Sequence, residues 1–201
     1  MSRIELPVPE TMTARQREVY DKIVGGRRGR IAGPLRAALL NPELADCWQA
    51  LGELLRYSTS LPPRLSEMAI LVTAEYCQSS MEWLAHQIAA EQAGVEKAII
   101  EDLQAGRKII GDSDDALICA FAAELNRFKS VSDETYDRAL ERFGDVALVE
   151  LTALVGYYTL VAMTVNAHEI PLPADMAHLE GPFPLPHRVP TAKLGTSTEC
   201  A

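Results

Sequence analysis

The residues of this chain that are best suited to chemistry lie in one short segment, between positions 65 and 86. Ser79, Glu82 and His86 are spaced three and four residues apart, so on a helix they share one face. Glu67 comes earlier, on what we expect to be a separate helix, and from there it could reach the same place. Two carboxylates, a hydroxyl and an imidazole at one helix junction indicate a site for proton transfer.

Glu82 and His86 are the centre of this hypothesis. A carboxylate four residues before a histidine can accept a hydrogen bond from the imidazole and fix its tautomer. The alternative is an ordinary Glu–His pair on a helix surface, which contributes only about 0.3 kcal/mol. Apolar residues surround both Glu67 and Glu82 in the sequence, which favours a buried setting where each acid needs a polar partner. The residues alone leave the catalytic and the structural interpretation equally open.

The overall composition is that of a soluble helical protein. The chain has 201 residues, 48% of them hydrophobic and only 6% aromatic, which suits a single domain with a real core. Its net charge of −9 argues against nucleic acid as a partner, because phosphate binding requires a cationic surface. The four cysteines form no Cys-x-x-Cys pair and no zinc spacing, so we expect no metal site and a reducing, cytoplasmic setting. The N-terminus shows no signal-peptide pattern.

Helical signals run through the whole chain, and no segment shows sustained strand-type alternation, so we predict an all-α fold. Capping residues and Gly or Pro breaks divide the helices. The expected helical ranges are 13–24, 33–40, 41–57, 61–77, 80–93, 95–105, 112–128, 132–143 and 145–169.

Two segments invite a more specific interpretation. The basic turn Gly25-Gly-Arg-Arg-Gly could hold an anion, but it follows a helix rather than a strand, so we favour a plain connector over a phosphate loop. The stretch 151–167 has no charged residue, but it is shorter than the roughly 20 residues of a membrane span. It also contains several polar residues, so we expect a central helix buried in protein and no membrane partner.

The composition changes after Pro171, where Pro, Gly and small polar residues dominate. We therefore divide the chain into an N-terminal helix and linker (1–32), a helical domain (33–173) and a Pro-rich C-terminal arm (174–201). Phe183, Leu185 and Val189 could dock this arm on a neighbouring subunit. The alternatives, an arm that wraps its own chain or is disordered, are equally open.

Several of these motifs together resemble the carboxymuconolactone decarboxylase family, which is related to the AhpD-like alkylhydroperoxidases. The resemblance covers roughly residues 15–173 and is carried by Gly33-Pro34-Leu35, Leu61-Pro-Pro-Arg64-Leu-Ser-Glu67, Glu82-Trp83-x-x-His86 and 148–173 with Gly156-Tyr-Tyr and Asn166-Ala. It implies an AhpD-like helical domain that assembles as a homo-oligomer, either a trimer or a hexamer, and needs no cofactor. Apolar helices such as 151–165 also require more cover than one subunit of this size provides.

The peroxidase branch of this family has two motif cysteines between its glutamate and its histidine. Laid on this chain, the glutamate falls on Glu67, the histidine on His86, and the cysteines on Ser79 and Glu82. Neither replacement can form a disulfide or supply a thiolate, so we do not expect thiol peroxidase activity. The decarboxylase branch matches better, because it keeps a glutamate four residues before the histidine.

The resemblance to the decarboxylase branch implies a cofactor-independent lyase or isomerase that acts on a small organic acid or lactone, as in aromatic-compound catabolism. His86 would donate the proton, Glu82 would orient it, and Glu67 would be a second relay. The side chains implied to contact the small-molecule substrate are Ser79, Trp83, Tyr157 and Asn166. True lactone decarboxylases lack the long Pro-rich tail, so we expect a close relative of the named enzyme, with its substrate left open. The alternatives are an AhpD-like peroxidase relative without its Cys-x-x-Cys and a non-catalytic small-molecule-binding protein.

Overall fold

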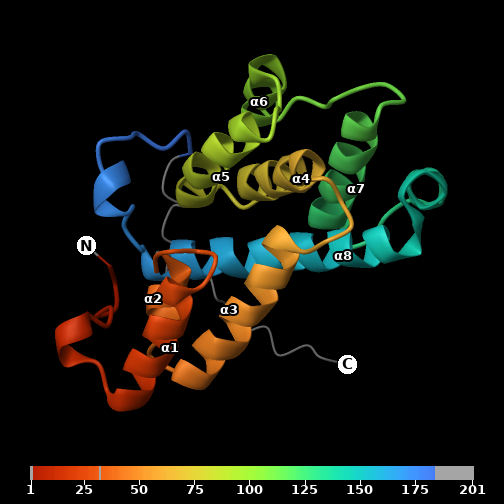
Figure 1. Cartoon of the computed structure of the whole chain (residues 1–201). Coiled ribbons are helices and arrows are strands. Elements are labelled where there is room, and N and C mark those ends of the chain that lie inside the picture. Colours follow the sequence, from red (N-terminus) through yellow and green to blue (C-terminus); the bar gives the residue numbers. More distant parts are fainter. Residues whose placement is uncertain (1, 32, 184–201) are drawn as a thin grey trace, which may run out of the picture.

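The computed structural model of the chain describes residues 2–31 and 33–183, and helices are the regular elements throughout this part (Figure 1). The predicted all-α fold is confirmed. The helices are α1 (Ala14–Gly25), α2 (Pro34–Ala38), α3 (Pro42–Tyr57), α4 (Pro63–Tyr76), α5 (Ser80–Gln92), α6 (Lys97–Gln104), α7 (Asp114–Phe128) and α8 (Asp133–His168). Short 3₁₀ turns at Pro9–Thr11 and Ala174–Met176, which the sequence did not predict, complete the described elements.

Local capping residues set the beginnings of four of these eight helices. Thr13 and Gln16 form a reciprocal capping box at the start of α1, because each side chain bonds the other residue's backbone N–H. Asn41, Ser113 and Ser132 each accept a hydrogen bond from a first-turn backbone N–H of α3, α7 and α8. These ends depend on residues close in sequence, which is why they could be predicted.

Two backbone breaks orient the helices that carry the candidate site. Gln78 has a φ of 52°, in the left-handed region, and this turn separates α4 from α5 where the sequence predicted a break. Gly144 has a φ of 79° and a ψ of 167°, a conformation open almost only to glycine, and it interrupts α8. The apolar segment of α8 therefore begins after Gly144, as predicted.

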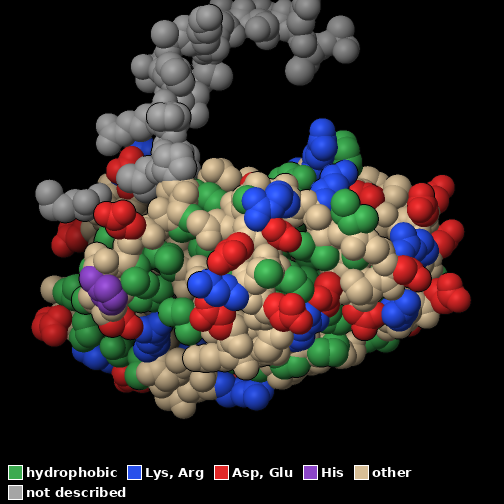
Figure 2. All heavy atoms as spheres, turned by 90° about the horizontal axis from the view of Figure 1, so that it is seen from above, with side chains coloured by type: hydrophobic (Ala, Val, Ile, Leu, Met, Phe, Trp, Pro, Cys, Tyr) green, Lys and Arg blue, Asp and Glu red, His purple; other side chains and the backbone are tan. Residues whose placement is uncertain are grey.

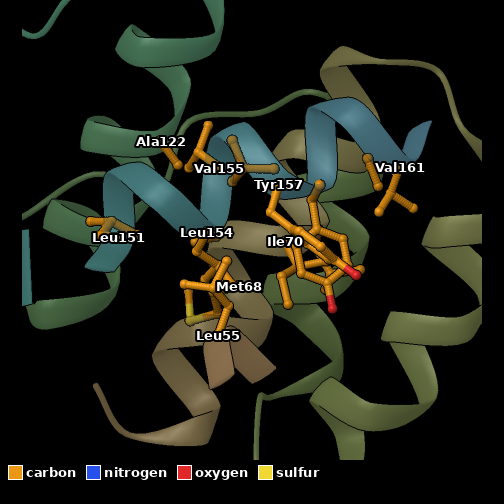
Figure 3. Close-up of a cluster of buried hydrophobic side chains, with 14 of the residues drawn as sticks. Leu55, Met68, Ile70, Ala122, Leu151, Leu154, Val155, Tyr157 and Val161 are labelled. Atoms are coloured by element: carbon orange, nitrogen blue, oxygen red, sulfur yellow. The ribbon is translucent and has the colours of Figure 1, made fainter. Parts of the chain in front are cut away.

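The most buried helix is α4, in which every residue from Leu65 to Ala74 is buried. It packs against α5, α7 and α8, so it lies at the centre of the core. In Figure 1, α8 runs across the middle of the view, with α4 to α7 on one side and α1 to α3 on the other. Figure 3 shows Leu151, Leu154 and Tyr157 of α8 within the shared apolar cluster.

The segment 151–167 lies in the central helix α8, and the expectation that it needs more cover than one subunit provides stays a prediction. Helix α8 is long and apolar enough to cross a membrane, but only half of its most apolar window is buried inside the protein. One face, which includes Val149 and Met163, is exposed to solvent. The apolar composition predicted burial, but it did not show whether the chain itself would provide it.

The described part of the C-terminal arm folds back on its own chain. The ring of Phe183 contacts the buried ring of Trp83 edge-on, with centroids 5.5 Å apart. Ser80 Oγ donates a hydrogen bond to the Phe183 carbonyl and accepts one from its N–H. Leu185 and Val189 lie outside the described residues, and the division into three segments stays a prediction. On the face shown in Figure 2, acidic and basic side chains are interspersed among apolar ones.

Candidate active site

Glu67 and His86 meet in the interior between α4 and α5. The distance from His86 Nδ1 to Glu67 Oε2 is 2.6 Å, and both side chains are buried. The turn after α4 folds α5 back along it, which brings together two residues 19 positions apart. A short bond to a carboxylate holds an imidazole in one orientation and leaves its other nitrogen free for chemistry.

Glu82 stands on the other side of the same imidazole. Its Oε2 lies 3.7 Å from His86 Nε2, which is too long for a hydrogen bond but places the carboxyl group directly beside the imidazole. Glu82 and His86 line a cavity, whereas Glu67 does not. The geometry therefore exchanges the two roles that the resemblance implied, because Glu67 orients the histidine and Glu82 faces the cavity.

Burial controls the acid–base character of the groups around His86. Removal from water raises the pKa of Glu82, and the nearby His86, Arg56 and Arg28 only partly oppose this effect. Burial likewise raises the pKa of Tyr158 well above its ordinary value. The Tyr158 ring packs edge-on against His86 with centroids 4.7 Å apart. A carboxyl that keeps its proton more readily than usual is suited to act as an acid.

The cavity beside His86 has a volume of about 150 Å³. Four helices, the 3₁₀ turn Ala174–Met176 and two connecting segments form its walls, so residues far apart in sequence meet there. Its lining residues are Arg28, Arg30, Gly33, Pro34, Leu35, Arg56, Met81, Glu82, Ala85, His86, Tyr157, Tyr158, Val161, Pro173 and Met176. An apolar cavity of roughly this size holds a benzene ring, which sets the scale of a fitting ligand.

Arginine side chains are the cavity feature that the sequence interpretation missed. Arg28 Nη2 donates to the Tyr157 hydroxyl at 3.3 Å, and the buried Nε of Arg28 has no hydrogen-bond partner. Arg56 also lines the cavity, and within the described part of the chain it forms no ion pair. Two guanidinium groups that are not neutralised by a bonded carboxylate suit an anionic ligand.

Gly52 of α3 makes this arrangement possible. A Cβ at position 52 would stand 2.0 Å from the Tyr157 hydroxyl and 2.3 Å from Arg28 Nη2. The turn 25–29, which we interpreted as a plain connector, therefore delivers Arg28 to the cavity. Its two adjacent arginines were the signal that could have found this residue, whereas Arg56 carried no local signal.

Of the four residues expected to contact substrate, Tyr157 alone lines this cavity. Ser79 is fully buried before α5, and its hydroxyl has no partner. Trp83 is also fully buried, with its indole N–H donating to Gln87 at 3.0 Å. Asn166 donates to the Cys77 carbonyl and lines a second cavity, of about 350 Å³, under the C-terminal arm. In this structure these three side chains do not line the cavity beside His86.

Within residues 2–31 and 33–183, no group of three or more His, Cys, Asp or Glu side chains is placed to hold a metal ion. Cys77 is half-buried near the α4–α5 turn, and burial raises the pKa of its thiol. A thiol that resists ionisation is a poor nucleophile toward peroxides.

No family model matches the chain, and no curated protein matches it in sequence. Solved structures do match it in three dimensions. An uncharacterised peroxidase-related protein from Silicibacter sp. TM1040 superposes with a TM-score of 0.70 at 16% identity, covering 88% of this chain and 94% of that one. A peroxidase-related protein from Ralstonia eutropha JMP134, described as an alkylhydroperoxidase AhpD core, gives a TM-score of 0.70 at 14% identity, with the same two coverages.

A third similar structure is the debrominase Bmp8 in complex with 2,3,4-tribromopyrrole. It gives a TM-score of 0.64 at 13% identity and covers 84% of this chain and 91% of its own. At such low identity these matches speak for the fold alone. They confirm what the motifs around Glu67 and His86 predicted about architecture: the chain has the all-helical AhpD-like fold.

Proposed function

We propose that this protein is a cofactor-independent enzyme that transfers a proton to or from a small organic acid or lactone, as a lyase or isomerase. The observation that carries the proposal is the buried row Glu67–His86–Glu82, whose free end opens into a cavity that also presents Arg28 and Arg56. Acid–base groups supply the proton, and the guanidinium groups supply a place for a carboxylate.

Each group has a distinct part in this chemistry. Glu67 accepts from His86 Nδ1 and so presents Nε2 to the cavity. In a decarboxylation, the bond between the carboxylate carbon and its neighbour breaks, carbon dioxide leaves, and the electron pair enters a conjugated carbonyl. His86, or the protonated Glu82 beside it, then delivers a proton to the resulting carbanion. An arginine near the carbonyl oxygen stabilises the negative charge that develops there.

A thiol peroxidase is the main rival, because two similar structures are peroxidase-related proteins. Its chemistry needs a reactive thiolate at the junction of α4 and α5. Here Ser79 and Glu82 stand at the motif positions, and the raised pKa of Cys77 disfavours its thiolate. We therefore favour proton transfer over thiol chemistry. We also propose that the protein is water-soluble and cytoplasmic.

Solvent-deuterium incorporation tests the reaction directly. The protein is incubated in D₂O with carboxymuconolactone as the probe, and proton NMR follows both loss of the substrate and the appearance of deuterium at carbon. We expect both with the wild type and neither with His86→Ala, whereas Glu75→Gln, near the C-terminal end of α4 and outside this cavity, should react like wild type. Equal rates for the wild type and His86→Ala would contradict the role of His86. Binding of the probe without any exchange would favour a non-catalytic binding protein.

Ligand charge tests the arginine wall separately. Calorimetry compares benzoate with benzamide, which has nearly the same shape but no charge. We expect the wild type to prefer benzoate at least about tenfold, and Arg56→Gln to lose this preference, because a charge-assisted hydrogen bond contributes roughly 1.5 to 3 kcal/mol. Arg127→Gln, an arginine away from the cavity, is the matched control. Equal affinity of the wild type for the two ligands would show that the cavity does not select an anion.

A further inference from the structure

We propose that two copies of this chain pack against each other through α8, antiparallel about a two-fold axis at Gly156. This inference is independent of the proposed function, because it rests on the face of α8 that points away from the candidate active site and the core. It names the surface, the partner and the register of the contact.

An unbroken apolar stripe runs along the solvent side of α8. Successive members are three or four residues apart, the spacing that brings side chains to one seam of a helix pair. Val149 is 71% exposed, and Val146 and Met163 are each 61% exposed. Single exposed apolar residues are ordinary, but a continuous stripe of them marks an interaction surface. The α8 stripe consists of Val146, Val149, Ala153, Gly156, Leu160 and Met163, all of them exposed.

The second observation that supports this contact is a glycine at position 156, which no contact in the described part of the chain requires. It lies inside a helix with ordinary helical backbone, where glycine is less favourable than alanine. A Cβ at this position would meet nothing within 4 Å. Gly52 is the opposite case, because a Cβ there would collide with the Tyr157 hydroxyl. A glycine that nothing within residues 2–31 and 33–183 requires, at the middle of an exposed apolar face, fits the close approach of another helix.

The stripe is complementary to itself when two copies run antiparallel. An axis at Gly156 places Gly156 opposite its own copy and Val149 opposite Met163, and it brings Leu160 next to Ala153 of the other copy, one residue from exact opposition. Each large side chain near the axis then faces a smaller one, which allows close packing. The stripe spans 18 residues, or about 27 Å of helix. A single helix face of that length is at the small end of specific interfaces, so we expect a reversible dimer with a dissociation constant in the micromolar range.

A second copy suits this face better than a membrane surface does. Helices that lie on membranes combine an apolar face with Lys and Arg that attract anionic lipid. At the start of this segment the flanking charges are instead mixed: Glu141 and Asp145 are exposed, and the exposed Arg142 between them is paired with Asp114. The whole chain carries a net charge of −9. A partner with the same uncharged stripe meets no such repulsion along the seam.

Sedimentation velocity on the full chain, over a concentration series that extends well above micromolar, tests the proposal. We expect the mass to rise from 22.0 kDa toward twice this value. Val149→Glu should weaken self-association at least about tenfold, because it buries a charge opposite Met163. Ile110→Glu is the matched control, since Ile110 is 89% exposed but lies outside α8. Circular dichroism verifies that each variant keeps its helices.

Cross-linking tests the register. In a background with Cys47→Ser and Cys200→Ser, oxidation should link Gly156→Cys to its own copy, whereas Ile110→Cys should stay monomeric. A wild type that stays at 22.0 kDa throughout the series, or a Val149→Glu variant that associates like the wild type, would overturn the proposal. So would a wild type that does not self-associate but binds phosphatidylglycerol vesicles through Val149. If the wild type forms a larger ring-shaped oligomer, Val149→Glu should halve the number of subunits in it, and this result would support the same α8 contact.

Discussion

Replacing Glu67 by alanine should reveal how strongly the buried Glu67–His86 pair holds α4 and α5 together. The variant removes the carboxylate 2.6 Å from His86 Nδ1 and leaves that ring nitrogen in the interior, with no other partner given to it by the structure. Removing one member of a buried charge-assisted pair destabilises a protein by about 3 kcal/mol or more, because the remaining group stays desolvated. Glu67→Gln keeps an acceptor of the same shape and loses only the charge assistance, so it should be destabilising by about 1 kcal/mol.

Guanidinium unfolding followed by circular dichroism measures the loss of unfolding free energy in both variants, and thermal unfolding measures the melting temperature. For a chain of this length, 1 kcal/mol corresponds to a shift of the melting temperature of about 2 to 4 °C, so the Ala variant should melt roughly 6 to 12 °C lower. Glu75→Ala is the control on the same helix, and we expect a change within about 0.5 kcal/mol because Glu75 has no ion pair in the described part of the chain.

A double-mutant cycle separates the pair from the cavity that alanine creates. Glu67→Ala combined with His86→Ala should show a coupling free energy of about 2 kcal/mol, as residues in direct buried contact do. A coupling near zero, or an alanine variant as stable as the wild type, would refute the pairing of these two side chains and the orienting role that we assign to Glu67.

Three further outcomes follow from the structure. Burial raises the pKa of Glu82 above its usual 4.5, so its protonated form favours the folded state; this stabilisation is complete below pH 4.5 and is lost as the pH rises through the raised pKa. Denaturant titrations should therefore show Glu82→Gln gaining stability relative to wild type from pH 5 to pH 8, and a constant difference would contradict the buried acid. Burial raises the pKa of the Cys119 thiol to about 12, so mass spectrometry should find Cys47, which is exposed, alkylated by iodoacetamide long before Cys119; equal rates would mean that α7 opens readily. Gly144→Ala should destabilise the chain by about 2 kcal/mol in urea unfolding, because its backbone conformation is strained for any residue with a Cβ, and an unchanged midpoint would show that α8 straightens without penalty.

Much of the fold could be read along the chain. The caps at Thr13, Asn41 and Ser132 predicted helix beginnings, and Gly144 predicted the interruption of α8, because capping and backbone conformation depend on residues within one turn. The meeting of Glu67 with His86 also had a local basis. The break between their helices indicated that Glu67 could reach His86, and the packing of α4 against α5 decides that they meet within one chain.

Other features depend on contacts that no local pattern reports. The sequence could not tell which glutamate orients the imidazole, because the answer depends on how α4 packs against α5. It also left Arg28 and Arg56 unassigned. Arg28 precedes α2 and Arg56 lies on α3, and both reach the cavity of His86 only in the folded chain, where the missing side chain of Gly52 leaves room for Arg28. Spacing along one helix indicated that Ser79 and Glu82 share a face, but burial decided that Glu82 alone reaches the cavity.

Helix α8 shows the same division most clearly. The identity of its residues establishes that it is an apolar helix that begins after Gly144, because helix formation and hydrophobicity are properties of a short segment. Which of its faces the chain covers, and that the face around Gly156 is left open, is decided by the packing of α3, α4 and α7 around it. Burial is a property of the whole assembly of elements, so only the tertiary structure could reveal which face of α8 the described part of the chain leaves exposed.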